Sequence, residues 1–219
     1  MRPEVCLRWI MVVACLVAGV AATVSLLGSG RDEAGGSAPA SVSVGEAVER
    51  TLAAGSVRVH ATMAPGPASA GPAIEVDGVT SLDDTRTRVT ARYADSAGDP
   101  GAAALEAEVR VTPAGTWLRS APSAEWAQVS PGVAGQATVT RGWGDLLRGL
   151  RAAGPTGRSP LAATHGGRPA RVWLDSSGRI GRLELDDPDR PLDLRFHDFG
   201  VAVDVSPPPG ASPPIDTGP

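Results

Sequence analysis

The chain has 219 residues, which is room for one ordinary domain together with a leader and tails. Its 20 basic residues are all arginines, scattered among 24 carboxylates to give a net charge of -4. This charge argues against a nucleic-acid partner, because such a domain usually carries a basic excess or stripe. The two cysteines are Cys6 and Cys15, so the rest of the chain has no disulfide framework and no thiol chemistry.

The first predicted element is an apolar leader at residues 1–28. Trp9–Leu27 is a run of 19 residues without a charge, and at about 1.5 Å per residue a helix of this length approaches the ~30 Å hydrocarbon thickness. Arg2 and Arg8 precede the run, and positive charge on this side favours an N-terminus inside the cell. We therefore predict a single-pass signal anchor in the cell membrane, with the C-terminal domain extracytoplasmic.

Two other fates of the leader stay open. Cleavage after Ala38-Pro39-Ala40 would release a secreted domain, but a removable signal usually has only about 7–15 apolar residues. Cys15 follows Val12-Val13-Ala14 as in a bacterial lipoprotein box, where the thiol takes a diacylglyceryl group, yet it sits inside the apolar run. A lipobox closes that run, so we favour a retained helix over lipidation at Cys15.

Residues 29–44 are rich in Gly, Ser, Ala and Pro and predict a flexible linker. The domain is expected over residues 45–205. Helical spacing predicts a helix at 44–54, which Gly55 ends. Period-two alternation then predicts strands over residues 57–63, 74–82, 87–93, 105–111, 116–119 and 126–129. Asp83-Asp84 predicts a turn between the second and third of these strands.

A second helix is predicted over Trp143–Ala153, with Gly154-Pro155 ending it. Ser176-Ser177-Gly178 is typical of a hairpin turn because Gly tolerates positive φ. The alternation around and after it predicts strands at 171–175, 179–186, 192–197 and 201–205. Residues 206–219 are Pro-rich and predicted to be disordered.

Strict alternation in almost every strand indicates one wet face and one apolar face, as in an antiparallel sheet that is covered on one side only. No strand–helix–strand rhythm appears, which excludes a doubly wound nucleotide-binding fold. The predicted fold class is α+β, with one curved antiparallel β-sheet wrapping a small helical layer, preceded by the leader helix.

Catalysis finds no support in the sequence. It has no Gly-x-Ser-x-Gly elbow, no phosphate loop and no His-Glu-x-x-His, so we do not expect an enzyme. His60 and His197 fall at polar-face positions and His165 in a turn, so we expect solvated histidines with no metal site and no cofactor. The pairs Asp83-Asp84 and Asp186-Asp187 fit local hydrogen bonding in turns.

The tryptophans of the domain, Trp117, Trp126, Trp143 and Trp173, accompany only one Tyr and two Phe in the chain. They fit core packing, or some of them line an apolar cavity between the sheet and the helices. The inward residues of the strands are mostly Val, Ala and Leu, which are small for filling a deeply curved sheet. The predicted cavity residues are Val59, Val89, Ala91, Val109, Trp117, Leu146, Leu150 and Leu183.

The hairpin VWLDSSGRIGRLEL at 172–185 and the ending FHDFGVAVDVSPPP at 196–209 resemble the actinobacterial exported lipoproteins of the LppX/LprG type. Their fold is similar to that of LolA, the lipoprotein carrier, and the likeness covers residues 45–209. The resemblance implies a half-barrel sheet over helices, an apolar cavity for acyl chains, and a role in shuttling or presenting lipids. Such proteins end their leader at a lipidated Cys, whereas this chain has Ser29 there.

We therefore expect a membrane-tethered extracytoplasmic protein that binds lipids or other acylated molecules in an apolar cavity. The alternative is an envelope-sensing or protein-interaction domain of the same fold without bound lipid. The expected contact with the membrane is Trp9–Leu27, and the sequence does not identify a protein partner.

Overall fold

The computed structural model describes residues 42–66, 72–94, 105–120, 125–129, 142–154, 159–210 and 212–215. The predicted leader at 1–28, Cys15 and most of the predicted linker lie outside these residues. No helix in the described part of the chain is long and apolar enough to span a membrane. The chain divides into Met1–Ser41 and Val42–Pro219, and the second of these carries the fold described below.

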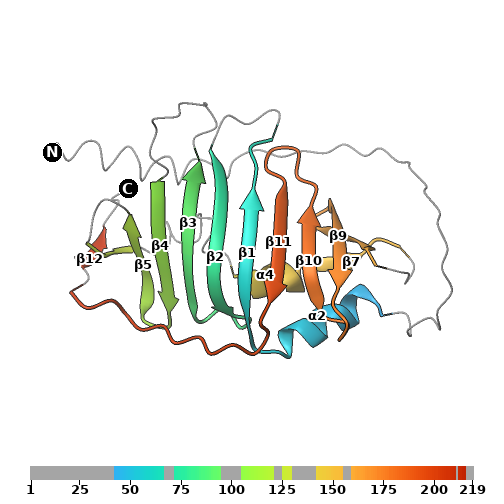
Figure 1. The fold of residues 1–219 in the computed structure, drawn as a ribbon, viewed down its shortest axis with the longest axis horizontal. Coiled ribbons are helices and arrows are strands. Elements are labelled where there is room, and N and C mark those ends of the chain that lie inside the picture. The colour runs from blue at the N-terminus through green and yellow to red at the C-terminus, as the bar shows by residue number, and fades with distance from the viewer. Residues whose placement is uncertain are drawn as a thin grey trace. The chain divides into compact units, whose positions relative to one another are not determined.

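The described strands form one twelve-stranded sheet in the order β12-β6-β5-β4-β3-β2-β1-β11-β10-β9-β8-β7 (Figure 1). Neighbouring strands are antiparallel except β12 and β6, which are parallel. The predicted antiparallel sheet is thus confirmed. The strands are β1 Ser56–Met63, β2 Ala73–Ser81, β3 Thr87–Ala94, β4 Leu105–Thr112, β5 Gly115–Ser120, β6 Ala127–Val129, β7 Leu150–Ala152, β8 Leu161–His165, β9 Arg168–Leu174, β10 Ile180–Leu185, β11 Leu192–His197 and β12 Ser212–Ile215.

Helix α2, Val44–Leu52, begins with a capping box formed by Ser43 and Glu46. The Ser43 hydroxyl accepts a hydrogen bond from the Glu46 amide at 3.2 Å, and the Glu46 carboxylate accepts one from the Ser43 amide at 2.8 Å. The helix contacts β7, β10 and helix α4. Its buried side chains, together with those of α4, join the inner face of the sheet in one hydrophobic core.

Helix α4, Trp143–Arg148, has no side-chain cap of its own because Gly142 occupies the N-cap position. Asp84, in the turn between β2 and β3, supplies the missing acceptors. Its carboxylate accepts hydrogen bonds from the amides of Gly144 at 2.8 Å and Asp145 at 2.9 Å, and from Arg148 at 3.1 Å. The β2–β3 turn therefore fixes the start of α4.

The structure corrects the predicted helix over Trp143–Ala153. The helix ends at Arg148, and Leu150–Ala152 form the short edge strand β7, which pairs with β8. His165 was predicted in a turn, but it is the last residue of β8, and the turn follows it at Gly166 and Gly167. Backbone pairing with β8 outweighs the helical pattern of Leu146, Leu147 and Leu150.

Two predictions near the C-terminus are also wrong. Residues 201–205, predicted as a strand, are not part of the sheet, although Ser56 donates a hydrogen bond to the Val201 carbonyl at 2.6 Å. Ser212–Ile215, within the segment predicted to be disordered, instead form β12 along β6. Alternation and Pro content describe the local preference of the backbone. Whether 201–205 and 212–215 join the sheet depends instead on which strand edges are open for pairing.

Candidate functional site

The inner face of the sheet carries two rows of side chains that run across the strands. Residues directly opposite each other in antiparallel strands lie on the same face. The first row is Phe196, Val59, Gly78, Val89, Val109 and Leu118, from β11 to β5. The second row is Leu183, Leu194, Ala61, Val76, Ala91 and Ala107, from β10 to β4.

Small side chains dominate the middle of these rows. Ala61, Val76, Ala91 and Ala107 are successive members of the second row. In the first row, Gly78 has no room for a side chain, because a Cβ there would approach the Arg88 carbonyl oxygen to 2.1 Å. These small side chains are flanked by Leu183 and Leu194 at one end of the second row, and the first row ends in Phe196 and Leu118.

Seven of the eight residues predicted to line a cavity contribute to the hydrophobic core of the sheet and helices. Leu146 is half-buried against that core, and the others are buried. The side chains of Val59, Ala91 and Leu183 are 0% exposed. In the described structure, the chain's own atoms therefore cover the predicted lining.

Trp117 does not share this surface. The register pairs it with Arg110 on β4, whereas Val109 pairs with Leu118. Because side chains alternate along a strand, Trp117 lies on the outer face. The prediction assigned an inward position to the largest side chain of β5, but the turn at Pro113-Ala114 sets the register that points Leu118 inward.

Trp143 is the tryptophan that belongs to the inner core. It is 4% exposed, and its indole N–H has no hydrogen-bond partner in the described part of the chain. Among the described residues, only Arg190 has another buried side-chain nitrogen or oxygen in this condition. A buried donor without an acceptor costs about 1–3 kcal/mol of stability. Helix α4 therefore carries an N–H group whose hydrogen bond a bound ligand could supply.

Two tryptophans instead pack against arginines. The Arg110 and Arg119 guanidinium groups lie 4.5 and 4.9 Å from the Trp126 ring centre. Trp173 on β9 lies opposite Arg182, whose guanidinium is 4.8 Å from its ring. These pairs are cation–π contacts, which explain how Trp is accommodated away from the inner core.

Glu108 is the most buried carboxylate of this outer surface, with an 11% exposed side chain. It pairs with Arg119 at 2.6 Å, Arg88 at 3.0 Å and Arg110 at 3.1 Å. Burial by itself raises its pKa, but the hydrogen bonds and charges of these arginines outweigh burial and hold the pKa below its ordinary value.

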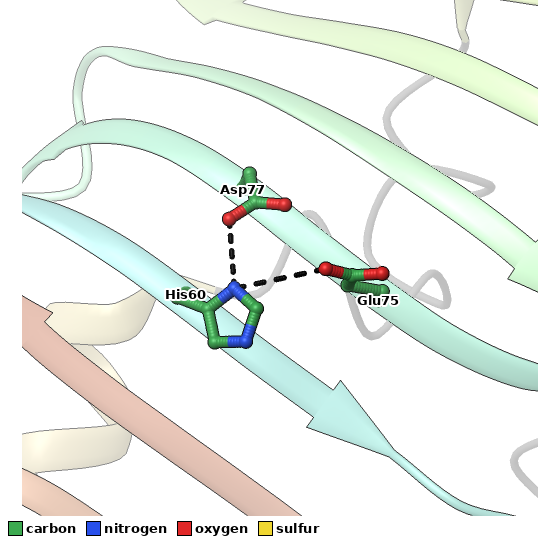
Figure 2. A group of neighbouring side chains, drawn as sticks. All are labelled: His60, Glu75 and Asp77. Atoms are coloured by element: carbon green, nitrogen blue, oxygen red, sulfur yellow. Dashed lines mark hydrogen bonds and ion pairs between the residues drawn. The ribbon is translucent and has the colours of Figure 1, made fainter.

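The three histidines lie on three different strands, β1, β8 and β11, and His60 has two carboxylates beside it. His60 on β1 lies opposite Asp77 on β2, with Glu75 close by (Figure 2). Their donor atoms all lie within 4.8 Å of one another. The sequence alone does not indicate this group, because the connection from β1 to β2 does not reveal which residues of the two strands face each other.

No family model matches the chain, and no curated protein matches it. The solved structures that are similar to it include LprF and LppX. LprF from Mycobacterium bovis is 14% identical, with a TM-score of 0.45, over 76% of this chain and 95% of its own. The Mycobacterium tuberculosis lipoprotein LppX is 21% identical, with a TM-score of 0.44, over 74% of this chain and 98% of its own.

Proposed function

We propose that the domain binds the acyl chain of a lipid or other acylated molecule between the inner face of the sheet and α4. The observation that carries this proposal is the indole N–H of Trp143, which lies in the hydrophobic core and has no acceptor among the described residues. An acyl chain ends in an ester, amide or carboxyl group whose oxygen would accept this hydrogen bond. Ligand sites of this kind are mostly apolar with a few placed polar groups.

The small side chains in the middle of the sheet support the same proposal. A methylene chain laid along Ala61, Val76 and Ala91 would meet little steric hindrance once the covering residues move aside. Helix α2 contacts β7, β10 and α4, and these two strands lie on the β7 side of β1 in the sheet order. Helix α4 has only six residues and carries Trp143, so it is the element we expect to shift when a ligand binds.

We further propose that Trp9–Leu27 anchors the domain on the extracytoplasmic side of the cell membrane. The length of the uncharged run and the arginines that precede it support this arrangement. Ser29 stands where a lipidated Cys would end the leader, so the helix takes the place of a lipid anchor. A domain held in this way binds its ligand at one membrane face.

A second candidate function is an interaction or envelope-sensing domain with a closed core. The complete burial of Val59, Ala91 and Leu183 favours it, because a core of this density needs no ligand to fill it. The two functions differ in whether the inner face ever opens.

Native mass spectrometry of a fragment spanning Val42–Pro219, the compact second unit, tests the first function. Co-purifying lipid, or saturable uptake of a fluorescent fatty acid, is the expected result. Trp143→Phe keeps an aromatic ring, although a smaller one, and removes the N–H, so we expect uptake to weaken about fivefold to tenfold, the equivalent of one hydrogen bond. Trp173→Phe, on the outer face, is the matched control. A ligand-free fragment that takes up no fatty acid supports the second function instead.

A further inference from the structure

We propose that His60, Glu75 and Asp77 form a binding site for a divalent transition-metal ion such as Zn²⁺ on the outer face of the sheet. The three side chains come from the neighbouring strands β1 and β2 (Figure 2). The proposal is independent of lipid binding, because His60 alternates with the inward residues Val59 and Ala61.

The backbone register holds the three donors together. His60 lies directly opposite Asp77, and its Nδ1 is 2.7 Å from the Asp77 Oδ1. Glu75 lies two residues before Asp77, on the same face, with its Oε1 4.0 Å from the same nitrogen. The donors thus sit on two paired strands inside the sheet, where position is more precise than on a loop.

The donor set suits zinc. An imidazole nitrogen and two carboxylate oxygens give three protein ligands, and zinc sites with this number keep a fourth position for water. With metal–ligand distances of about 2.0–2.2 Å, tetrahedral donors lie about 3.3 Å apart. The 2.7 Å separation must therefore widen and the 4.0 Å separation must shorten, each by less than about 1 Å, which side-chain rotation supplies.

The site is reachable from solvent, because the side chains of His60, Glu75 and Asp77 are 32%, 47% and 42% exposed. Arg92 on β3 donates a hydrogen bond to the Asp77 Oδ2 at 3.2 Å. This bond orients the carboxylate and leaves Oδ1 directed at His60, as outer-shell partners do in metal sites. The positive charge of Arg92 at the same time opposes a bound cation.

Metal binding at this site requires a free lone pair on His60 Nδ1. The Asp77 carboxylate only accepts, so Nδ1 carries the hydrogen in the 2.7 Å contact, and this hydrogen must move to Nε2 before Nδ1 can bind a metal. Besides Glu75 and Asp77, the charged groups nearby are Arg195, opposite His60 on β11, and Arg92.

Isothermal titration of the metal-free full chain in detergent with Zn²⁺ tests the site. Cys6 and Cys15 are changed to Ser beforehand, so that no thiol binds the ion. We expect a single equivalent of zinc to bind. Glu75→Gln or Asp77→Asn should weaken binding at least about tenfold, and His60→Ala should abolish it. His197→Ala, which removes an exposed histidine on β11, should leave binding unchanged.

Arg92→Gln is the variant for which we expect a higher zinc affinity. It removes the charge next to Asp77 but keeps a hydrogen-bond donor, so zinc should bind more tightly. The ¹⁵N chemical shift of His60 Nδ1 should change on zinc addition, which remains measurable if His60→Ala fails to fold. The proposal is overturned if His60→Ala binds zinc like the unchanged chain, or if zinc leaves the His60 resonance unmoved. The three residues would then be an ion-pair cluster only.

Discussion

Asp84 is the residue on which the attachment of α4 depends. Its carboxylate side chain, 15% exposed, accepts hydrogen bonds from two amides at the start of the helix and from Arg148. Asp84→Ala should lower the free energy of unfolding by about 1–2 kcal/mol, the usual cost of a lost helix cap. Urea unfolding of the Val42–Pro219 fragment measures this change.

Two control variants separate the hydrogen bonds of Asp84 from other effects. Asp84 has a φ of 63°, so Ala also adds backbone strain, whereas Asp84→Gly removes the same carboxylate without it. Asp145→Ala removes a 78% exposed carboxylate that binds the same Arg148, and its effect should be close to zero. Equal stability of all three variants would contradict the assigned role.

Glu108 should make the stability of the sheet depend on pH. Its lowered pKa means that its contribution is fully present above the ordinary pKa of a glutamate and is lost as the pH falls through the lowered value. Glu108→Gln should cost about 1–2 kcal/mol at neutral pH, moderated by the solvent exposure of Arg88 and Arg119. The difference from the unchanged chain should shrink in acid.

Urea unfolding at neutral and acidic pH measures this dependence. Glu106→Gln is the matched control, because Glu106 is on the same strand but 54% exposed and lies 3.5 Å from Arg92. A Glu108→Gln penalty that is the same at both pH values would show that the lost contribution is packing and not charge.

At the scale of elements, Thr51 joins α2 to the sheet. It is 0% exposed; its hydroxyl donates to the Ala47 carbonyl at 2.6 Å and accepts from the Ile180 amide at 2.8 Å. Thr51→Val keeps the shape but leaves the Ile180 N–H at the start of β10 without an acceptor. We expect a loss of about 1–3 kcal/mol.

Thr51→Ser retains the hydroxyl and loses only a methyl group, so it should recover most of the stability that Thr51→Val loses. Hydrogen exchange of the Ile180 amide reports the bond directly, and protection should fall in the valine variant alone. Unchanged exchange in that variant would mean that another group satisfies the amide.

The elements that the sequence predicts well are those whose local pattern agrees with their pairing. β1, β3 and β4 alternate strictly, and their inward residues Val59, Ala91 and Val109 are buried as expected. In β7 the local pattern and the pairing disagree. Leu150 continues the helical pattern of α4, but pairing with β8 makes this segment a strand. Pairing between distant segments decides such cases, and one sequence does not show it.

The candidate sites follow the same division. The apolar inner face is predictable because alternation alone separates it from the outer face. The group at His60 is not, because it depends on the register that sets His60 opposite Asp77. Trp117 shows the converse, since a register set by the turn before β5 moved a predicted lining residue to the outer face.

At the scale of the whole molecule, β1 and β11 are neighbours in the middle of the sheet, so its inner face combines strands from distant parts of the chain (Figure 1). A ligand that binds only the folded domain stabilises it by mass action, by about 2.7 kcal/mol at a hundred times its dissociation constant. The melting temperature of the Val42–Pro219 fragment should therefore rise with fatty-acid concentration. Trp143→Phe should reduce the rise, and Trp173→Phe should not.

Ala91→Trp distinguishes an inner face that opens from one that stays closed. Ala91 is in the row of small side chains and is 0% exposed. If the inner face opens, the added ring occupies the space of the ligand, and the fatty-acid-dependent rise disappears while the ligand-free domain keeps its melting temperature. In a closed core the same change overpacks the interior and costs about 1–3 kcal/mol. Loss of stability without any fatty-acid effect in the unchanged fragment would favour the interaction domain over lipid binding.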